Sequence, residues 1–302
     1  WDKFFLLMNG QGERRMNNIF PRTCIGGVSV PRMIIGTNWF LGYSHYTKAK
    51  GSYIEKNVRN RKKISEILEV FFSYGIDAVL GRAATETPLA EAIIDARERT
   101  GRNAIIISTP SFPVNPSSPE KGFRNSEVEA ILDKEALSGT VVCLPHQCTT
   151  DAMLDRCTRK IRKFEEVTAM IRERGMIPGL STHMPESIIY ADESGLDVET
   201  YISIYNSMGF LMQVEVDWTS KIINNANKPV IAIKPMASGH IRPFQALNFV
   251  WNTIRKTDMV AVGTMSPDEA KEVIELSLSI LEKRDTALDL QTTRSKSVIE
   301  NK

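Results

Sequence analysis

The sequence predicts a single (β/α)8 barrel, the TIM-barrel class of α/β fold, with an N-terminal β-hairpin. The main observation is that short apolar runs alternate with amphipathic stretches eight times along the chain. Alternating strands and helices imply a parallel sheet, and eight such units close a barrel. No linker or low-complexity segment interrupts the alternation. We therefore expect one barrel domain over residues 16–302, with residues 1–15 as a disordered or artefactual leader.

The first elements have the clearest signals. Residues 24–30 predict the hairpin, because Gly26-Gly27 lies between β-branched residues and supplies the turn. The first barrel strand is expected over residues 33–40. The first helix ends near Gly75, a typical C-terminal stop, and its apolar residues recur with a period of 3.6: Ile64, Ile67, Leu68, Phe71 and Phe72.

The other seven units repeat this pattern. Their strands are expected at residues 77–81, 103–110, 140–146, 176–182, 200–206, 229–234 and 259–263. Their helices are expected at residues 87–101, 125–137 and 161–175, after Pro185, before Asn227, at residues 244–254 and from Ser266. Ser266-Pro267-Asp268-Glu269 predicts a capping box at the start of the last helix.

Charge and composition exclude several classes of function. The net charge is only +2, whereas a nucleic-acid-binding domain usually carries a strongly basic face. The longest apolar run near the N-terminus, residues 4–8, is too short for a membrane span or a signal-peptide core. None of the four cysteines forms a C-x-x-C pair. We expect a cytoplasmic protein with no nucleic-acid or membrane partner.

In a barrel of this class the reactive groups lie at the carboxyl ends of the strands and in the loops that follow. Four residues at such positions are the candidate catalytic residues: Arg82, His146, His183 and Lys234. His183 has an alternative role as a cap of the next helix, and Lys234 can also be a surface lysine. Other polar or aromatic side chains at these ends are Thr37, Asn38, Trp39, Tyr43, His45, Tyr46, Glu86, Ser108, Thr109, Gln147, Ser181, Thr182, Tyr205, Asn206 and Thr264.

Lys234 ends the apolar run of the seventh strand. Alternation places Val230, Ala232 and Lys234 on one face of that strand. If Ala232 points into the barrel, Lys234 points into its mouth. A lysine there can hold an anion or, when desolvated, act as a base or a Schiff-base nucleophile.

An anion site is also predicted in the loops after the seventh and eighth strands. These loops contain Ala237-Ser238-Gly239 and Gly263-Thr264-Met265-Ser266. Backbone amides there, together with the N-terminus of the last helix, can bind an anion. The candidate binding residues are therefore Ser238, Gly239, Gly263, Thr264 and Met265.

From Cys24 onward the chain resembles the aldo-keto reductase superfamily. The resemblance lies in residues 25–37, 177–183 with Pro185-Glu186, Tyr205-Asn206, 230–236 and 261–267. The Lys234-Pro235 variant is similar to a bacterial branch of that superfamily. The resemblance implies NADP as a possible cofactor, with Ser181, Thr182 and Asn206 among the residues that would bind it. Thr182 stands where the family usually has asparagine.

The resemblance also implies a catalytic Asp, Tyr, Lys and His, of which only His146 has an obvious counterpart. Leu80 replaces the aspartate, Pro110 replaces the lysine, and residues 81–89 contain no tyrosine. One hypothesis is an enzyme that has lost hydride transfer and acts on a small anionic, even phosphorylated, substrate by lyase, isomerase or hydrolase chemistry. The alternative is a divergent NADP-dependent oxidoreductase or a non-catalytic nicotinamide-binding protein. A metal held by His146 and His183 has no supporting spacing motif.

Overall fold

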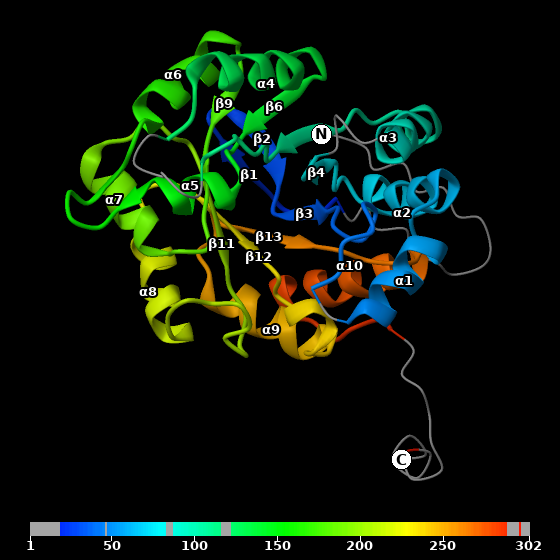
Figure 1. The fold of residues 1–302 in the computed structure, drawn as a ribbon. Helices are drawn as coiled ribbons and strands as arrows, with labels where there is room; N and C mark the ends of the chain where they lie inside the picture. Colours follow the sequence, from blue (N-terminus) through cyan, green and yellow to red (C-terminus); the bar gives the residue numbers. More distant parts are fainter. Residues whose placement is uncertain (1–18, 46, 83–86, 116–121, 289–295, 297–302) are drawn as a thin grey trace, which may run out of the picture.

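The computed structural model describes residues 19–45, 47–82, 87–115, 122–288 and 296. The expected leader at residues 1–15 lies outside this range. In the described part of the chain, nine parallel strands form one sheet that is surrounded by helices (Figure 1). The strands are β3 (Met33–Gly36), β4 (Ala78–Leu80), β5 (Ile105–Ser108), β6 (Thr140–Cys143), β9 (Ile177–Pro178), β10 (Leu180–Ser181), β11 (Tyr201–Ile204), β12 (Val230–Ile233) and β13 (Met259–Val262).

The sheet closes through a strand that is divided in two. The order is β10-β11-β12-β13-β3-β4-β5-β6-β9, so its two ends, β9 and β10, are consecutive in sequence and separated only by Gly179. A Cβ at Gly179 would lie 2.6 Å from the Leu144 side chain, so the close approach requires glycine. Counted as one strand, β9 and β10 complete eight positions, which confirms the predicted (β/α)8 barrel.

The expected helices surround this sheet. They are α2 (Arg61–Ser73), α3 (Thr87–Thr100), α4 (Asn125–Leu137), α6 (Phe164–Glu173), α7 (Glu186–Ser194), α8 (Val216–Asn225), α9 (Pro243–Thr253) and α10 (Pro267–Glu282). Helix α2 begins where Asn60 Oδ1 accepts hydrogen bonds from the amides of Lys62 and Lys63, and the apolar face predicted for it is fully buried.

Several shorter elements were not predicted. They are α1 (Lys48–Asn57), α5 (Gln147–Met153), β7 (Leu154–Asp155), β8 (Lys160–Ile161) and the 3-10 turn η2 (Ala237–Gly239). Ile161 belongs to the β7–β8 hairpin, so the fourth-unit helix starts at Phe164 and the expected start at residue 161 was wrong. Helix α1 has only one buried residue, Ile54, and contains Gly51, so it lacks the apolar period that reveals α2.

One end of the barrel is covered by the predicted hairpin. Strands β1 (Arg22–Ile25) and β2 (Val28–Pro31) pair antiparallel. Ile25 and Val30 are fully buried and pack with the side chains inside the barrel, including Ile34 and Met259. The carboxyl ends of the strands therefore form the mouth of the barrel.

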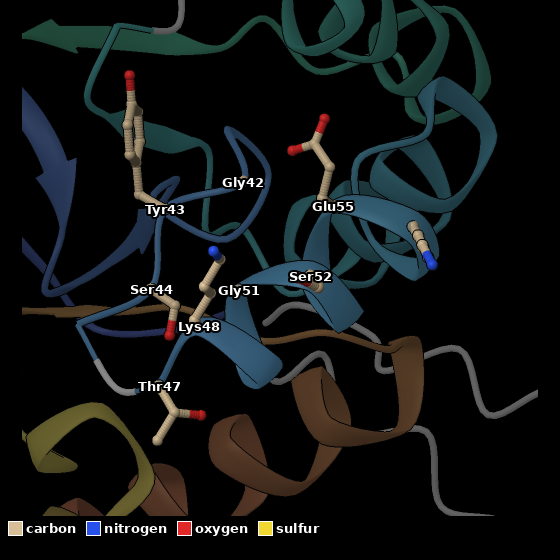
Figure 2. Close-up of a pocket in the computed structure, with 9 residues that line it drawn as sticks. Gly42, Tyr43, Ser44, Thr47, Lys48, Gly51, Ser52 and Glu55 are labelled. Atoms are coloured by element: carbon tan, nitrogen blue, oxygen red, sulfur yellow. The ribbon is translucent and has the colours of Figure 1, made fainter.

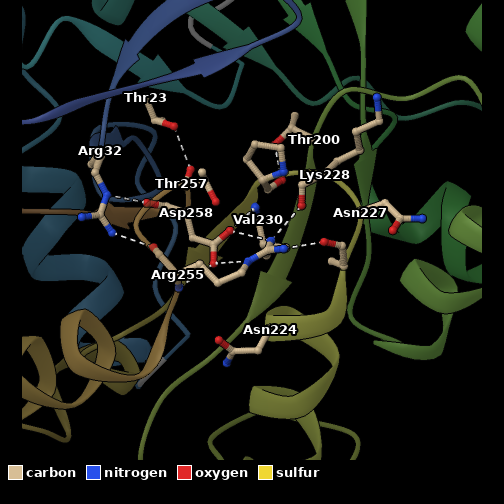
Figure 3. Close-up of polar contacts among 12 residues, drawn as sticks. Thr23, Arg32, Thr200, Asn224, Asn227, Lys228, Val230, Arg255, Thr257 and Asp258 are labelled. Carbon is tan, nitrogen blue, oxygen red and sulfur yellow. Dashed lines mark hydrogen bonds and ion pairs between the residues drawn. The ribbon is translucent and has the colours of Figure 1, made fainter.

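A polar network stabilises the amino-terminal ends of the last strands (Figure 3). Asp258 is completely buried. Its carboxylate accepts hydrogen bonds from the backbone amide of Val230 and from the guanidinium of Arg255, and Arg32 donates to its carbonyl oxygen. Because these residues adjoin β12, β13 and β3, the network connects neighbouring strands at the end opposite the mouth. No helix among the described residues is long and apolar enough to cross a bilayer.

Candidate functional site

Lys234 reaches the mouth of the barrel, but for a different reason than strand alternation. Ala232 faces the surrounding helices with Val230, whereas Ile231 and Ile233 belong to the cluster inside the barrel. The condition that Ala232 points inward was therefore wrong. Strand β12 ends at Ile233, and Lys234 adopts a left-handed backbone conformation with φ of 57°. This conformation interrupts the alternation.

The Lys234 ammonium lies against a histidine. Its Nζ atom is 3.5 Å from His183 Nε2. Desolvation lowers the pKa of Lys234 to about 8. Desolvation, followed by the charges of Lys234, His146 and His45, lowers the pKa of His183 to about 3. At neutral pH the site thus contains a largely protonated lysine beside a neutral imidazole.

Two further histidines belong to the same cluster. Desolvation lowers the pKa of His45, and so does the nearby charge of Lys234. Desolvation also lowers the pKa of His146, assisted by Arg82 and Lys234. These effects place both imidazoles within electrostatic reach of Lys234. His45, which was expected only as part of an aromatic loop, is therefore a member of the site.

His146 also has a structural task that the sequence did not reveal. Its Nδ1 accepts a hydrogen bond from the amide of Cys148 and caps α5, while the Cys148 thiol lies 3.1 Å from the same nitrogen. The thiol and one nitrogen of the exposed Arg82 both contact the Ser111 hydroxyl. The only available signal was that Cys148 follows His146 by two residues, within the first turn of a helix that was not predicted.

The backbone of His183 is fixed by a hydrogen bond to Asp151, a second residue that the sequence analysis did not identify. The Asp151 carboxylate accepts the backbone amide of His183 and, at 2.6 Å, the hydroxyl of Thr182. Desolvation raises the pKa of Asp151. His183 does not cap the next helix: Pro185 occupies the N-cap position of α7 without a side-chain hydrogen bond. The alternative role considered for His183 is therefore wrong.

Two of the residues expected to hold a nicotinamide, Thr182 and Asn206, already use their side chains in hydrogen bonds within the chain. Thr182 Oγ1 also accepts the amide of Met184 at 2.9 Å. Asn206 uses its carbonyl oxygen for the amides of Met208 and Phe210 and its amide nitrogen for the carbonyl of Phe210. Ser181 is buried at the end of β10. Thr182 and Asn206 therefore do not fit a cofactor held through their side chains.

The predicted anion loops are also partly occupied. The amide of Met265 donates to the Glu269 carboxylate at 2.7 Å, and Ser266 caps the amide of Glu269, as the capping box predicted. The amide of Gly239 donates to Met236 within η2. The amides of Met265 and Gly239 are thus not available to an anion, and the negative charge of Glu269 opposes one at the α10 N-terminus.

The other residues of these loops have different surroundings. Ser238 adopts a left-handed conformation with φ of 57°. A Cβ at Gly263 would lie 3.9 Å from the Trp39 ring, so the indole covers this glycine. The Thr264 hydroxyl is buried and has no hydrogen-bond partner in the described part of the chain. Thr264 therefore contributes a buried, unused hydroxyl to this group.

The positions matched to the reductase tetrad hold no reactive group besides His146. Leu80 is buried and packs inside the barrel, and Pro110 contributes only its carbonyl oxygen, which accepts the amide of His146. Within the described residues, no group of three or more His, Cys, Asp or Glu side chains is arranged to hold a metal ion.

An open pocket lies in the segment of the chain that contains His45 (Figure 2). Its volume is about 570 Å³, and it is formed by the loop after β3 and by α1. In sequence, His45 stands between two residues that line the pocket, Ser44 and Thr47. The lining comes entirely from residues 42–56: Gly42, Tyr43, Ser44, Thr47, Lys48, Gly51, Ser52, Glu55 and Lys56. Lys234 is not part of this lining.

The fold is a (β/α)8 barrel similar to those of solved structures described as aldo-keto reductases. A "putative aldo-keto reductase" structure from Pseudomonas aeruginosa matches with a TM-score of 0.61 and 15% identity, covering 89% of this chain and 100% of that one. A second structure with that description matches with a TM-score of 0.60 and 14% identity, over the same shares. No protein-family model and no curated protein matches the sequence. The predicted resemblance is confirmed for the fold.

Proposed function

We propose that this protein is an enzyme that binds a small anionic substrate at the barrel mouth and does not perform the hydride transfer of aldo-keto reductases. The observation that carries the proposal is the contact between Lys234 and His183 at the carboxyl ends of the strands, with His45 and His146 in electrostatic reach. Perturbed titratable groups gathered in this part of a barrel favour an active site.

The surroundings of Lys234 support a catalytic role for this residue. Its positive φ is shared with Lys163 and Lys283 at helix ends, so the backbone conformation alone does not mark a function. At Lys234, however, the side chain lies against His183 and out of bulk water, which lowers its pKa to about 8. A surface lysine would not be desolvated in this way.

The charge of the mouth supports an anionic substrate. Lys234 and Arg82 are its cations, and no carboxylate forms an ion pair with Lys234 in the described residues. The surrounding imidazoles can donate hydrogen bonds without adding charge. Trp39 covers the side of the mouth at Gly263, which favours a small molecule over a polymer.

The loss of hydride transfer is supported by the surroundings of the mouth. Leu80 and Pro110 can neither donate a proton nor tune the pKa of a neighbouring acid. The side chains of Thr182 and Asn206 form hydrogen bonds within the chain, to Asp151 and Phe210, instead of facing a cofactor. Acid–base or covalent chemistry by Lys234 and His183 is therefore favoured over reduction.

Sulfate tests this proposal directly. The melting temperature of the protein should rise with sulfate by specific binding in addition to the general stabilisation by excluded salt. Lys234→Met should lose the specific part, whereas Lys62→Met, which removes an exposed lysine from α2, should respond as the wild type does. Equal slopes for all three proteins would contradict anion binding at Lys234.

A further inference from the structure

We propose that Lys234 forms a Schiff base with the carbonyl carbon of an aldehyde or ketone that also carries an anionic group. This proposal rests on the proposed function, because it uses the same site, and it adds the substrate class and the covalent step. It is carried by the position of the Lys234 amine, by its contact with His183, and by the imidazoles around them.

The amine is placed as a nucleophile rather than as a structural charge. Its contact is with a neutral imidazole nitrogen at 3.5 Å, and it forms no ion pair with a carboxylate of the described residues. An ion-paired lysine would keep its proton and remain unreactive. The Lys234 side chain is partly buried. Desolvation then provides a neutral fraction of the amine near physiological pH.

His183 is placed to orient the amine of Lys234. An ammonium can only donate, so His183 Nε2 accepts and its own proton lies on Nδ1. Because its pKa is about 3, this imidazole stays neutral, and the ammonium proton goes to solvent water when the free amine forms. Asp151 fixes the position of His183 through the backbone amide. The acceptor is thereby held beside the nucleophile, as nucleophilic catalysis requires.

The covalent step balances without any further reactant. The free Nζ pair forms a bond to the carbonyl carbon, the C=O π pair moves to oxygen, and a proton passes from the new ammonium nitrogen to that oxygen to give a carbinolamine. The proton that the ammonium first gave to solvent is returned by solvent to the hydroxyl, which leaves as water while the nitrogen pair forms the C=N bond. The net change is ammonium plus carbonyl giving a protonated imine plus water, with no oxidation or reduction.

His146 suits the anionic part of such a substrate. It accepts the Cys148 amide at Nδ1, so its proton lies on Nε2, where it can be donated. Arg82 is close enough for its charge to lower the pKa of His146. A carboxylate or phosphate on the substrate would therefore meet a neutral donor at His146 while the carbonyl lies at Lys234.

The test is reductive trapping with glyoxylate, a small aldehyde with a carboxylate. The full chain is incubated with glyoxylate and sodium cyanoborohydride, and peptide mass spectrometry measures carboxymethylation of each lysine. Lys234 should be modified at least about tenfold faster than the exposed Lys62 at pH 7.5, because desolvation lowers the pKa of Lys234 and leaves more of it as the free amine. Modification of Lys234 no faster than that of Lys62 would overturn the proposal.

Acetaldehyde and sulfate separate the covalent step from anion binding. If acetaldehyde modifies Lys234 as fast as glyoxylate does, the imine step is supported but the anionic substrate is refuted. If sulfate binds at Lys234 but glyoxylate leaves no adduct there, the proposed anion site is supported and the Schiff base is refuted. Sulfate should slow the glyoxylate reaction at Lys234 and leave Lys62 unaffected.

Variants of His183 test its orienting role. His183→Leu removes the acceptor beside the Lys234 amine and should slow trapping at Lys234 about tenfold. His183→Gln keeps an acceptor in its side-chain amide and should recover most of the rate, a rescue that a merely structural role would not produce. Circular dichroism establishes that both variants are folded. A folded His183→Leu variant that traps glyoxylate at the wild-type rate would remove His183 from the mechanism.

Discussion

Lys234 contacts His183 across an intervening strand. Lys234 follows β12 and His183 follows β10, and β11 lies between these two strands in the sheet. Side chains from alternate strands meet only if both lean toward the barrel axis. The contact therefore places the lysine near the centre of the mouth, where ligands of this fold bind.

Sulfate binding should weaken as the pH rises through about 8. Lys234 loses its proton there, while the depressed pKa values of His45, His146 and His183 keep those imidazoles neutral from pH 7 upward. Isothermal titration calorimetry should show the affinity falling about fivefold between pH 8 and 9, as the protonated fraction of Lys234 does. Lys234→Met should show weak binding at every pH. Undiminished wild-type affinity at pH 9.5 would mean that another cation holds the anion.

Removing the desolvated charge should stabilise the fold at neutral pH. The pKa of Lys234 falls from 10.5 to about 8 on folding, so between these values the unfolded chain holds more protons and the free energy of unfolding rises with pH. Below pH 8 the full cost of the buried charge is present. Lys234→Met should be more stable by about 1–2 kcal/mol at pH 7, after allowance for solvent screening.

Urea unfolding at pH 7 and at pH 9.5 measures this effect. The difference between Lys234→Met and the wild type should shrink at the higher pH, whereas Lys62→Met should match the wild type at both. A difference that is independent of pH would show that lost packing, rather than charge, explains the change.

The protein should not oxidise NADPH with ordinary aldehydes or ketones. Leu80 and Pro110 replace two members of the reductase tetrad, and the hydrogen bonds of Thr182 and Asn206 are used within the chain. Absorbance at the NADPH band follows the reaction, and calorimetry follows binding. Turnover that disappears in His146→Ala would show that the site works as a reductase after all.

Asp258→Ala should be strongly destabilising. The buried carboxylate compensates the Arg255 guanidinium and accepts the Val230 amide, so its removal leaves a partly buried cation and an unpaired amide. The expected loss is about 3–5 kcal/mol in urea unfolding. Asp133→Ala removes an exposed partner of Arg174 and should cost less than about 1 kcal/mol. Similar losses in both variants would contradict a structural role for the network.

The sequence was sufficient to predict the barrel because its signals are local. The period of α2, the paired glycines of the hairpin and the capping box of α10 each report on a few neighbouring residues. Such signals fail where the chain lacks a period, as in α1, and where a strand is interrupted, as at Gly179. Element boundaries differ from expectation mainly at such places.

The site was less predictable because it depends on which polar groups form hydrogen bonds with one another in the folded chain. Lys234 was placed in the mouth by an alternation argument, but its left-handed backbone brings it there. The Met265 amide was predicted to bind an anion, but it donates its hydrogen bond to the Glu269 carboxylate. Cys148 and Asp151 contact the site histidines, and both lie on the short helix α5, which no sequence pattern predicted. Periodicity shows which face a residue occupies, but not the contacts of its side chain.

The division of the fifth strand at Gly179 affects how well the folded protein resists aggregation. Closure passes through hydrogen bonds such as Gly179 to Cys143 on one side and Leu180 to Thr200 on the other, over strand pieces of two residues each. If these bonds open, the sheet gains two exposed edges that can pair with other chains. Resistance to aggregation on long storage should therefore depend on this short segment more than on the long helices around it.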